Sequence, residues 1–556
     1  MNVNYFFLLN IFISFLSATD YYVATSYGND TNNGTSINTP FKTIAKAASV
    51  MSSGDICYIR QGRYHETVTI NNLDGSSGSA IIFTNYNNER VIMDGTIPIT
   101  STWTQVGSSN IWRTKLSSDI WQLFLDWEEQ VMARWPNAKF SDNTIWDNDN
   151  YWAKGTIDDD ENAYSNGTII DDPYTNSAGT TINLSAAGFD LDETNKQAIA
   201  ILNLGSFRTW SRLVTSHSGN TFNYSTVPNW KTKHHYYFLE GRREFLDQAG
   251  EWWYDTYNNA DSLYYYASNG VDPNRLNFRG KLQSYAFSIT GSEYIQIKNI
   301  EFFGTTVYFS NGDNCVVYGC NFMYPSCSKR MLRTVDTEPE MTKFASGSVG
   351  SAIRNCAFRN SDGTALEMWG GTDTVYNCYF TNIDYSVADN SSIMLTMRMN
   401  GTANVFRKNT VHRTGASATV MVGDAGLVEY NNLYDTGHLQ SDGSMIQFME
   451  AQQDGAICRY NWLHDTEKYG ARFDHSGTAD GTNGTMHHNL AWNCESGGIM
   501  VKGDNHKVYN NTVLNSGSKN DIIVFQVNNG DHASSIIRNN PADKDCVFIF
   551  ETAVQV

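Results

Sequence analysis

The second half of the chain repeats one pattern, in which an asparagine is followed by residues that alternate between apolar and polar. Several intervals between these asparagines, such as 409 to 431, are 22 residues long. Alternation predicts strands, and strands separated by turns at this period are typical of a right-handed parallel β-helix with one repeat per coil. The repeat is centred on Asn355, Asn377, Asn409, Asn431, Asn461, Asn489 and Asn511.

Repeated turns place equivalent side chains above one another along the axis of a β-helix. We therefore expect the asparagines to lie in or near one turn row, where their amides hydrogen-bond from coil to coil. Cys320, Cys356 and Cys378 occupy nearly equivalent positions, which predicts an internal cysteine row rather than a metal or redox site. Leucine-rich repeats share the period, but their leucine consensus is absent.

The pattern divides the chain into unequal parts. From Phe41 to Met51 the apolar residues have helical spacing, and we expect this helix to cap the N-terminal end of the β-helix. The repeat is missing between residues 101 and 283, where eleven of the fourteen tryptophans lie. We predict an all-β, pectate-lyase-like fold. Residues 19–100 form the cap and first coils, 101–283 an inserted β-rich subdomain, and 284–556 the main right-handed parallel β-helix.

The chain starts with a short apolar run, YFFLLNIFISFLS, from Tyr5 to Ser17. The run is shorter than the roughly 18 apolar residues that a membrane-spanning helix needs, and polar residues follow it, as they follow a secretory signal. We therefore predict a signal peptide in residues 1–18. The mature protein is expected to be a secreted, extracellular glycoprotein that does not associate with a membrane.

Charge and motifs narrow the classes of partner. A net charge of -19 disfavours nucleic acid as a partner. No nucleotide fingerprint, P-loop, HExxH or nucleophile elbow occurs in the sequence, so no cofactor is expected. The acidic loop from Asp147 to Asn162 could hold Ca²⁺, but it lacks the spacing and the glycine of an EF-hand. We expect a monomer whose partner is a polysaccharide.

Candidate chemistry lies on one face of the predicted coils. In segments such as TALEMWGG, SMIQFMEAQ and YGARFDHSG, the apolar alternates, for example Leu366 and Phe473, are expected to point inward. The remaining positions then face outward along a groove, with two further side chains just past the strands. These candidates are Glu367, Trp369, Arg398, Gln447, Arg472, Asp474 and Lys502, followed by Glu450 and His475.

Two segments of the insertion carry a family resemblance. LDWEEQVMARWPN, Leu125 to Asn137, and EFLDQAGEWWYD, Glu244 to Asp255, resemble paired signatures of secreted right-handed β-helix carbohydrate-active proteins, including β-helix glycoside hydrolases such as some β-xylosidases and α-fucosidases. That family usually has proline where this chain has Ala249. The tryptophans and tyrosine of these segments are expected to dock the insertion on the β-helix, with sugar stacking as the alternative. They are Trp135, Trp252, Trp253 and Tyr254.

The resemblance favours hydrolysis of a complex, acidic or sulfated polysaccharide. Glycosidases need two carboxylates about 5 to 9.5 Å apart, and Asp474 with Glu450, one coil away, is the predicted pair, with His475 as a third catalytic residue. Arg472 and Lys502 are predicted to hold substrate anions. The predicted binding surface also includes Arg398, Glu367, Trp369 and Gln447.

Two alternatives stay open. A polysaccharide lyase would use Arg472, Lys502 and His475 for β-elimination on a uronate polymer. A non-catalytic β-helix that binds glycans would need neither arrangement. Each charged residue also has a purely structural interpretation, such as an ion pair between Arg472 and Asp474.

Overall fold

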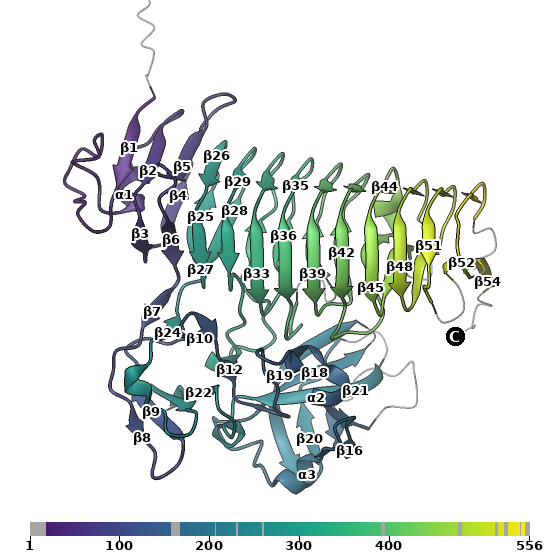
Figure 1. The fold of residues 1–556 in the computed structure, drawn as a ribbon, viewed down its shortest axis with the longest axis horizontal. Coiled ribbons are helices and arrows are strands. Elements are labelled where there is room, and N and C mark those ends of the chain that lie inside the picture. The colour runs from purple at the N-terminus through teal and green to yellow at the C-terminus, as the bar shows by residue number, and fades with distance from the viewer. Residues whose placement is uncertain are drawn as a thin grey trace, which may run out of the picture.

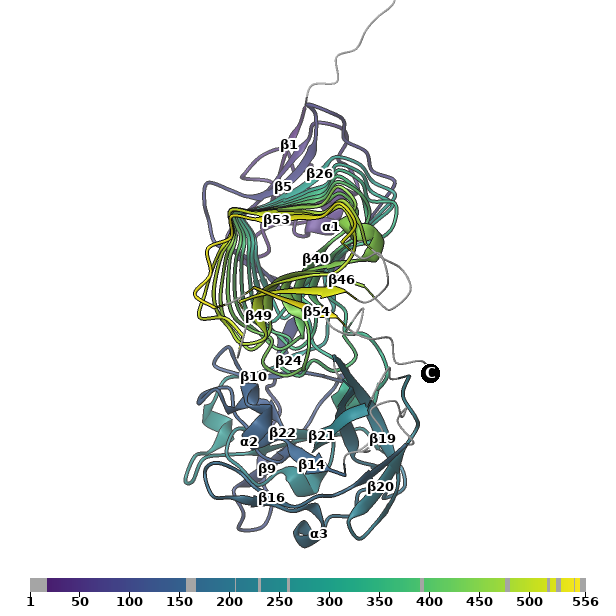
Figure 2. The same cartoon turned by 90° about the vertical axis from the view of Figure 1, so that its right-hand side faces the viewer.

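The computed structural model describes residues 18–156, 167–205, 207–228, 232–257, 261–390, 395–475, 481–517, 521–526, 532–544 and 546–550. The predicted signal peptide and the end of the acidic loop therefore lie outside the described residues. The chain forms a right-handed parallel β-helix with an inserted region docked on its side (Figures 1 and 2). The predicted fold class is confirmed.

Three parallel sheets build the β-helix, because most coils contribute one short strand to each sheet. Sheet A contains β1 (Asp20–Val23), β2 (Ile56–Ile59), β5 (Ile81–Asn85), β26 (Ile295–Lys298), β29 (Val316–Tyr318), β32 (Ala352–Arg354), β35 (Thr374–Tyr376), β38 (Val405–Arg407), β41 (Leu427–Glu429), β44 (Ile457–Arg459), β47 (Thr485–His487), β50 (Lys507–Tyr509) and β53 (Ile536–Arg538). Sheet B contains β3 (Gly62–Tyr64), β6 (Val91–Asp94), β27 (Glu301–Phe303), β30 (Asn321–Met323), β33 (Ala357–Ser361), β36 (Tyr379–Ile383), β39 (Thr410–Thr414), β42 (Asn432–Thr436), β45 (Trp462–Thr466), β48 (Leu490–Cys494) and β51 (Thr512–Leu514).

Along the chain, a sheet C strand follows the sheet B strand in most coils. It contains β4 (Val68–Asn71), β25 (Tyr285–Thr290), β28 (Thr306–Ser310), β31 (Thr342–Phe344), β34 (Leu366–Met368), β37 (Leu395–Met399), β40 (Ala418–Val422), β43 (Ser444–Met449), β46 (Tyr469–Asp474), β49 (Gly497–Val501), β52 (Ile522–Gln526) and β54 (Cys546–Phe550). The predicted inward positions, such as Leu366, Ile446 and Phe473, are at most 1% exposed. Phe302, Phe322 and Phe358 stack inside the solenoid with ring centroids 4.6 Å apart.

A buried asparagine ladder follows sheet A, and the prediction of a turn row is confirmed with one correction. The Nδ2 atom of Asn461 donates to Oδ1 of Asn489 at 2.9 Å, and Asn489 donates to Asn511 in the same way. Asn355 and Asn377 instead form an exposed pair one residue earlier in the turn, at 2.7 Å. The residue that continues the buried ladder is Cys378, whose backbone N–H donates to Asn409 Oδ1. The cysteine row is therefore the early part of the same ladder.

The N-terminal coils join the rest of the solenoid directly. Strands β4, β5 and β6 pair with β25, β26 and β27, which follow the insertion. The N-terminal helix α1 is shorter than predicted and spans Ile44–Ala48. It packs against β1, β2 and β4, and its capping role stays a prediction. Among the described residues, no helix is long and apolar enough to cross a membrane.

The inserted region runs from β7 to β24 and has mainly antiparallel sheets. Its strands are β7 (Thr96–Pro98), β8 (Thr104–Gln105), β9 (Ile111–Lys115), β10 (Leu123–Leu125), β11 (Glu128–Glu129), β12 (Val131–Met132), β13 (Arg134–Trp135), β14 (Ala153–Gly155), β15 (Thr168–Ile170), β16 (Tyr174–Thr175), β17 (Thr181–Ile182), β18 (Ile199–Gly205), β19 (Arg208–Ser218), β20 (Thr221–Tyr224), β21 (Thr232–Glu240), β22 (Glu251–Asp255), β23 (Ser262–Tyr266) and β24 (Phe278–Lys281). Its short helices are α2 (Asn148–Tyr151) and α3 (Leu184–Ala187).

The insertion docks on the turns that lead from sheet B to sheet C (Figure 2). Trp146 and Trp152 of the insertion share an apolar cluster there with Tyr385, Val387 and Leu439 of these turns. The tryptophans of the two motif segments have a different position. Trp252, Trp253 and Tyr254 are buried in the core of the insertion, and Trp135 packs against that core. One contact of these segments with the β-helix is the backbone N–H of Tyr254, which donates to Met331 Sδ at 3.4 Å.

Candidate active site

Ionisable side chains gather in two regions of the molecule. The first is the outer face of sheet C, where the sequence placed its candidates. Glu367 pairs in register with Arg398, and Gln447 pairs with Arg472, so these side chains stand in one line, which we call the sheet C row. Met421 occupies the position between Arg398 and Gln447.

At the early end of the sheet C row, the side chains contact one another and Lys343 of the preceding strand. The Trp369 indole Nε1 donates to Glu367 Oε2 at 2.8 Å, and Lys343 Nζ lies 2.8 Å from the same oxygen. The Arg398 guanidinium lies 4.5 Å from the centre of the Trp369 ring. Glu367 is fully buried, so this end is a packed ionic cluster.

The late end of the row is an alternating chain of charges. Arg472 lies 2.7 Å from Asp442 and 3.1 Å from Asp474, and Lys502 lies 2.9 Å from Asp474. Burial raises the pKa of Asp474, but Arg472 and Lys502 outweigh this effect, and the pKa is lowered. Asp474 is therefore ionised at neutral pH and is not a proton donor.

Glu450 and His475 lie at the border of the row. Met449 pairs in register with Asp474, so the next residues, Glu450 and His475, are level in neighbouring coils. Glu450 begins the 3₁₀ helix η6 (Glu450–Gln453), and the buried His475 donates its backbone N–H to Asp474 Oδ1 at 3.0 Å. The structure thus brings the three predicted catalytic residues to the same two coils.

The second region is a cavity of about 430 Å³ at the corner where the insertion meets the β-helix. We call it the corner cavity. The insertion contributes the segments 128–131, 138–146 and 249–251 to its wall, and the β-helix contributes Tyr324, Asn360, Asn382 and Tyr385. Segments 128–131 and 249–251 belong to the two motif segments, so the resemblance marked this wall although its acids were not singled out.

A two-residue turn positions the acidic side of the cavity. Strands β10 and β11 form a hairpin in which Leu125 pairs with Glu128 across Asp126 and Trp127, which have φ angles of 49° and 73°. Such a turn usually needs small or polar residues, so a tryptophan there is strained. Two guanidinium groups contact the indole, with Arg63 3.7 Å and Arg279 4.8 Å from the ring centre.

Glu129 is one of two acids in the cavity wall whose pKa is raised by burial, and its hydrogen-bond partner is the neutral Tyr385 hydroxyl. Burial raises its pKa to about 8, and hydrogen bonds from Tyr385 and Gln122 partly oppose this effect. The Tyr385 hydroxyl donates to Glu129 Oε1 at 2.6 Å. Oε2 is buried and has no hydrogen-bond partner among the described residues. The proton of the neutral acid therefore has its place on Oε2.

A second acid of the wall is also protonated near neutral pH. Burial raises the pKa of Glu251 to about 8, although its Oε2 atom accepts backbone N–H groups of Asp247 and Gln248 at 3.0 and 2.9 Å. Glu128 differs, because it is exposed and accepts a hydrogen bond from the Tyr324 hydroxyl at 3.3 Å. The cavity thus combines neutral and solvated carboxyl groups.

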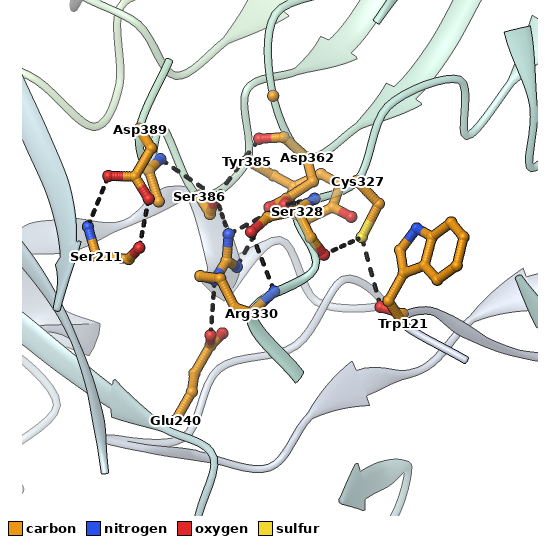
Figure 3. A network of polar contacts seen from close by, with 12 residues as sticks. Trp121, Ser211, Glu240, Cys327, Ser328, Arg330, Asp362, Tyr385, Ser386 and Asp389 are labelled. Atoms are coloured by element: carbon orange, nitrogen blue, oxygen red, sulfur yellow. Dashed lines mark hydrogen bonds and ion pairs between the residues drawn. The ribbon is translucent and has the colours of Figure 1, made fainter. Parts of the chain in front are cut away.

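A buried ionic network surrounds Arg330 (Figure 3), and Arg330 lines a smaller pocket that shares Glu129 and Tyr385 with the corner cavity. Arg330 is 2% exposed and lies 3.0 Å from both Glu240 and Asp362. Asp384, one coil after Asp362, is fully buried, and burial raises its pKa to about 7. Asp389 accepts the backbone N–H of Ser211 at 2.9 Å, which ties the β-helix to the insertion.

Sequence reasoning missed these acids for different reasons. Glu128, Glu129 and Glu251 stood in the motif segments, where the tryptophans drew the interpretation. Asp362 and Asp384 directly follow sheet B strands and are 22 residues apart, a spacing that could have marked them. Within the described parts of the chain, no group of three or more His, Cys, Asp or Glu side chains is arranged to hold a metal ion.

Comparisons with known proteins agree with the fold. Residues 344–516 match the family model described as the right handed beta helix region. An uncharacterized protein of Bacillus subtilis (strain 168), YwoF, is 40% identical over 76 residues, which are 14% of this chain and 16% of that protein. The matched part is therefore a small share of YwoF.

Two solved structures have similar folds over most of their length. A structure titled glycoside hydrolase matches 95% of this chain and 97% of its own, with a TM-score of 0.63 and 14% identity. The complex of XylC with xylose matches 95% of this chain and 86% of its own, with a TM-score of 0.50 and 13% identity. Each match covers 95% of this chain. A match of that extent must include the insertion, because the β-helix without the insertion makes up a smaller share of the chain.

Proposed function

We propose that this protein is a secreted carbohydrate-active enzyme that hydrolyses glycosidic bonds in the corner cavity, with Glu129 as the general acid. The observation that carries the proposal is a neutral carboxyl group, Glu129, that lines a cavity of about 430 Å³ and has one buried oxygen without a hydrogen-bond partner among the described residues. The similar folds of a glycoside hydrolase and of XylC bound to xylose support the reaction class.

The chemistry of a glycosidase requires such an acid. The leaving-group oxygen must receive a proton as the bond to the sugar breaks, so the donor has to be protonated at the working pH. A pKa of about 8 keeps Glu129 protonated at neutral pH. Because Tyr385 occupies Oε1, the proton would be carried by Oε2, which is buried and has no hydrogen-bond partner among the described residues. A substrate oxygen that takes this proton would have to reach Oε2 from the cavity that Glu129 lines.

The reaction also needs an ionised carboxylate as nucleophile or as base for water. We assign this role to Glu128, which lines the same cavity and is exposed. Asp362 is the competing candidate, but both of its oxygens face Arg330, at 3.0 and 3.4 Å, and it is 1% exposed. A substrate would have to break that ion pair to reach Asp362.

The sheet C row is the site of the alternative proposals. Hydrolysis there would use Asp474, Glu450 and His475, and a lyase would use Arg472, Lys502 and His475 on a uronate polymer. Asp442 and Asp474 already neutralise the two cations. A substrate anion would therefore have to replace an existing ion pair, and we rank the row second.

Paired substitutions test the assignment. Glu129→Gln keeps the shape of the side chain and removes the acidic proton, so hydrolysis should fall at least about 10²-fold, whereas Asp474→Asn should leave it close to wild type. Both variants would be compared on a glycan panel by release of reducing ends, with ultraviolet absorbance recording unsaturated lyase products. Full activity of Glu129→Gln together with loss in Asp474→Asn would move the site to the row. Binding without any turnover by the wild type would favour a glycan-binding protein.

A further inference from the structure

We infer that the corner cavity accepts an uncharged glycosyl unit with free hydroxyl groups and excludes uronate and sulfated units. This inference rests on the proposed function, because it names the substrate of the same cavity. It also replaces the expectation of an acidic or sulfated polysaccharide, which was based on Arg472 and Lys502 in the sheet C row.

The charges of the cavity wall offer nothing to a substrate anion. The described residues that line the cavity include three acids, Glu128, Glu129 and Glu251, and one base, Lys139. With Glu129 and Glu251 protonated near neutral pH, the remaining charges are those of Glu128 and Lys139, and they cancel. An anionic unit would gain no net attraction and would meet Glu128.

Nearby arginines are not available to compensate. Arg330 lines a neighbouring pocket that shares Glu129 and Tyr385 with the cavity, but it is 2% exposed and lies 3.0 Å from Glu240 and from Asp362. Arg134 is also buried, and its guanidinium donates to the backbone oxygens of Pro136 and Tyr151 at 2.9 and 3.2 Å. Withdrawing either group from its partners would leave a buried donor unsatisfied.

One side chain of the cavity wall, Asn382, has an acceptor oxygen that lacks a hydrogen bond within the described part of the chain. The amide of Asn382 donates through Nδ2 to Asn360 Oδ1 at 2.9 Å. Its own Oδ1 is buried and has no hydrogen-bond partner among the described residues. A sugar hydroxyl can donate to this oxygen, whereas an ionised carboxylate or a sulfate has only acceptors. A buried acceptor without a partner is unfavourable, so an uncharged polyol is the better match.

Apolar surface completes the match with a neutral sugar. Phe140 and Trp146 line the cavity together with the polar groups, and the Phe140 ring lies edge-on to Tyr385 with centroids 4.9 Å apart. Ligand sites of this size combine such apolar walls with a few placed polar groups. The C–H faces of a sugar ring can contact the aromatic rings while its hydroxyls bond to Asn382 and Glu129.

Matched ligands test the inference on the full-length chain. Neutral gluco-, galacto- and xylo-oligosaccharides would be compared with glucuronate and galacturonate oligomers of equal length, by turnover with the wild type and by titration calorimetry with the Glu129→Gln variant. We expect at least a tenfold preference for the neutral ligands in both measurements. Equal or better use of the uronates would overturn the inference while leaving the hydrolase proposal intact.

Binding separates the two ideas when turnover is absent. Preferred binding of neutral ligands by Glu129→Gln, with no hydrolysis by the wild type, would overturn the proposed function and support the inference. Absence of binding for both ligand sets would overturn the inference. Asn382→Ala should weaken binding of the neutral ligand about tenfold, as expected for one lost hydrogen bond, and Asn360→Ala, which keeps the Asn382 carbonyl oxygen in the wall, should have a smaller effect.

Discussion

The sheet C row and the corner cavity both collect charged residues on the β-helix, but they treat charge differently. In the row, acids alternate with bases at contact distance, as in the chain Asp442, Arg472, Asp474 and Lys502. In the corner, Glu129 and Glu251 have no basic partner within hydrogen-bond distance among the described residues, and burial keeps them protonated. Paired charges hold the coils together, whereas acids with displaced pKa values are candidates for chemistry.

The origin of the two regions explains this difference. Neighbouring coils repeat at a fixed register, so a base in one coil can meet an acid in the next coil, as Lys502 meets Asp474. The corner is made by chain segments that do not repeat. Two of its polar atoms, Glu129 Oε2 and Asn382 Oδ1, have no hydrogen-bond partner among the described residues.

The largest effect is expected in the row. Arg472→Met leaves Asp442 without its close cation and Asp474 with Lys502 alone, so the free energy of unfolding should fall by about 3–5 kcal/mol. Denaturant unfolding at pH 7 would measure it, with the exposed Lys507→Met as a control that should change stability by at most about 0.5 kcal/mol. If Arg472→Met lowered the free energy of unfolding as little as the control does, the comparison would fail. The ion pairs of the row would then contribute little to stability, and its charged groups could bind a substrate instead.

The acid side of the stability curve should change in the same variant. Because the folded-state pKa of Asp474 is lowered, its contribution is present above the ordinary aspartate pKa of about 3.9 and is lost as pH falls through the folded value. Arg472→Met should lose part of this dependence below about pH 4, since one of the two cations is gone. An unchanged slope would assign it to other carboxylates.

A smaller effect is expected at the corner, in the pH dependence of kcat/KM. The wild type should lose activity as pH rises through about 8, where Glu129 loses its proton. The Tyr385 hydroxyl stabilises the Glu129 carboxylate, so Tyr385→Phe should raise the Glu129 pKa. The alkaline limb of the pH profile, where activity falls, should then move to higher pH. Tyr324→Phe removes a hydroxyl that bonds to Glu128 and should leave the limb in place. A shift of the same size in both variants would contradict a specific role of Tyr385.

The smallest effect concerns the strained turn. Trp127→Gly relieves a left-handed backbone that costs a bulky residue about 1–2 kcal/mol, but it removes the ring that Arg63 and Arg279 hold. We expect little change in the melting temperature and a several-fold fall in kcat with KM nearly constant, because the hairpin carrying Glu128 and Glu129 is less fixed. Trp127→Phe, which keeps a ring, should recover part of kcat. A large loss of stability with normal kcat would make the tryptophan purely structural.

Periodicity made most of the β-helix predictable. The alternation placed Leu366, Ile446 and Phe473 inside, and the structure confirms them. The asparagine repeat gave the turn row but not its exact offset, because Cys378 replaces asparagine in the buried ladder and Asn377 stands outside it. A motif shifted by one residue looks the same in sequence, although only one of the two positions belongs to the buried ladder and the other forms an exposed pair.

The candidate site was less accessible to sequence reasoning. The members of the sheet C row could be aligned because strand pairing follows the repeat, yet their ion pairs depend on loops such as the one that carries Asp442. The corner cavity depends on how the insertion docks against turns more than two hundred residues away, for example between Tyr385 and Glu129. No local pattern encodes that contact. The functional roles of Asp474, Glu450 and His475 stay predictions.

The position of the insertion also bears on the order in which the chain folds. Ile81 in sheet A pairs with Ile295, whereas Leu427 pairs with Ile457 in the same sheet. Closing a long loop has a larger entropic cost than closing a short one, and non-local pairing slows folding. We therefore expect the coils after the insertion to nucleate first and the three N-terminal strands to join late. During synthesis the strands that emerge first from the ribosome would wait for their partners, and their unpaired edges would be the segment most exposed to aggregation.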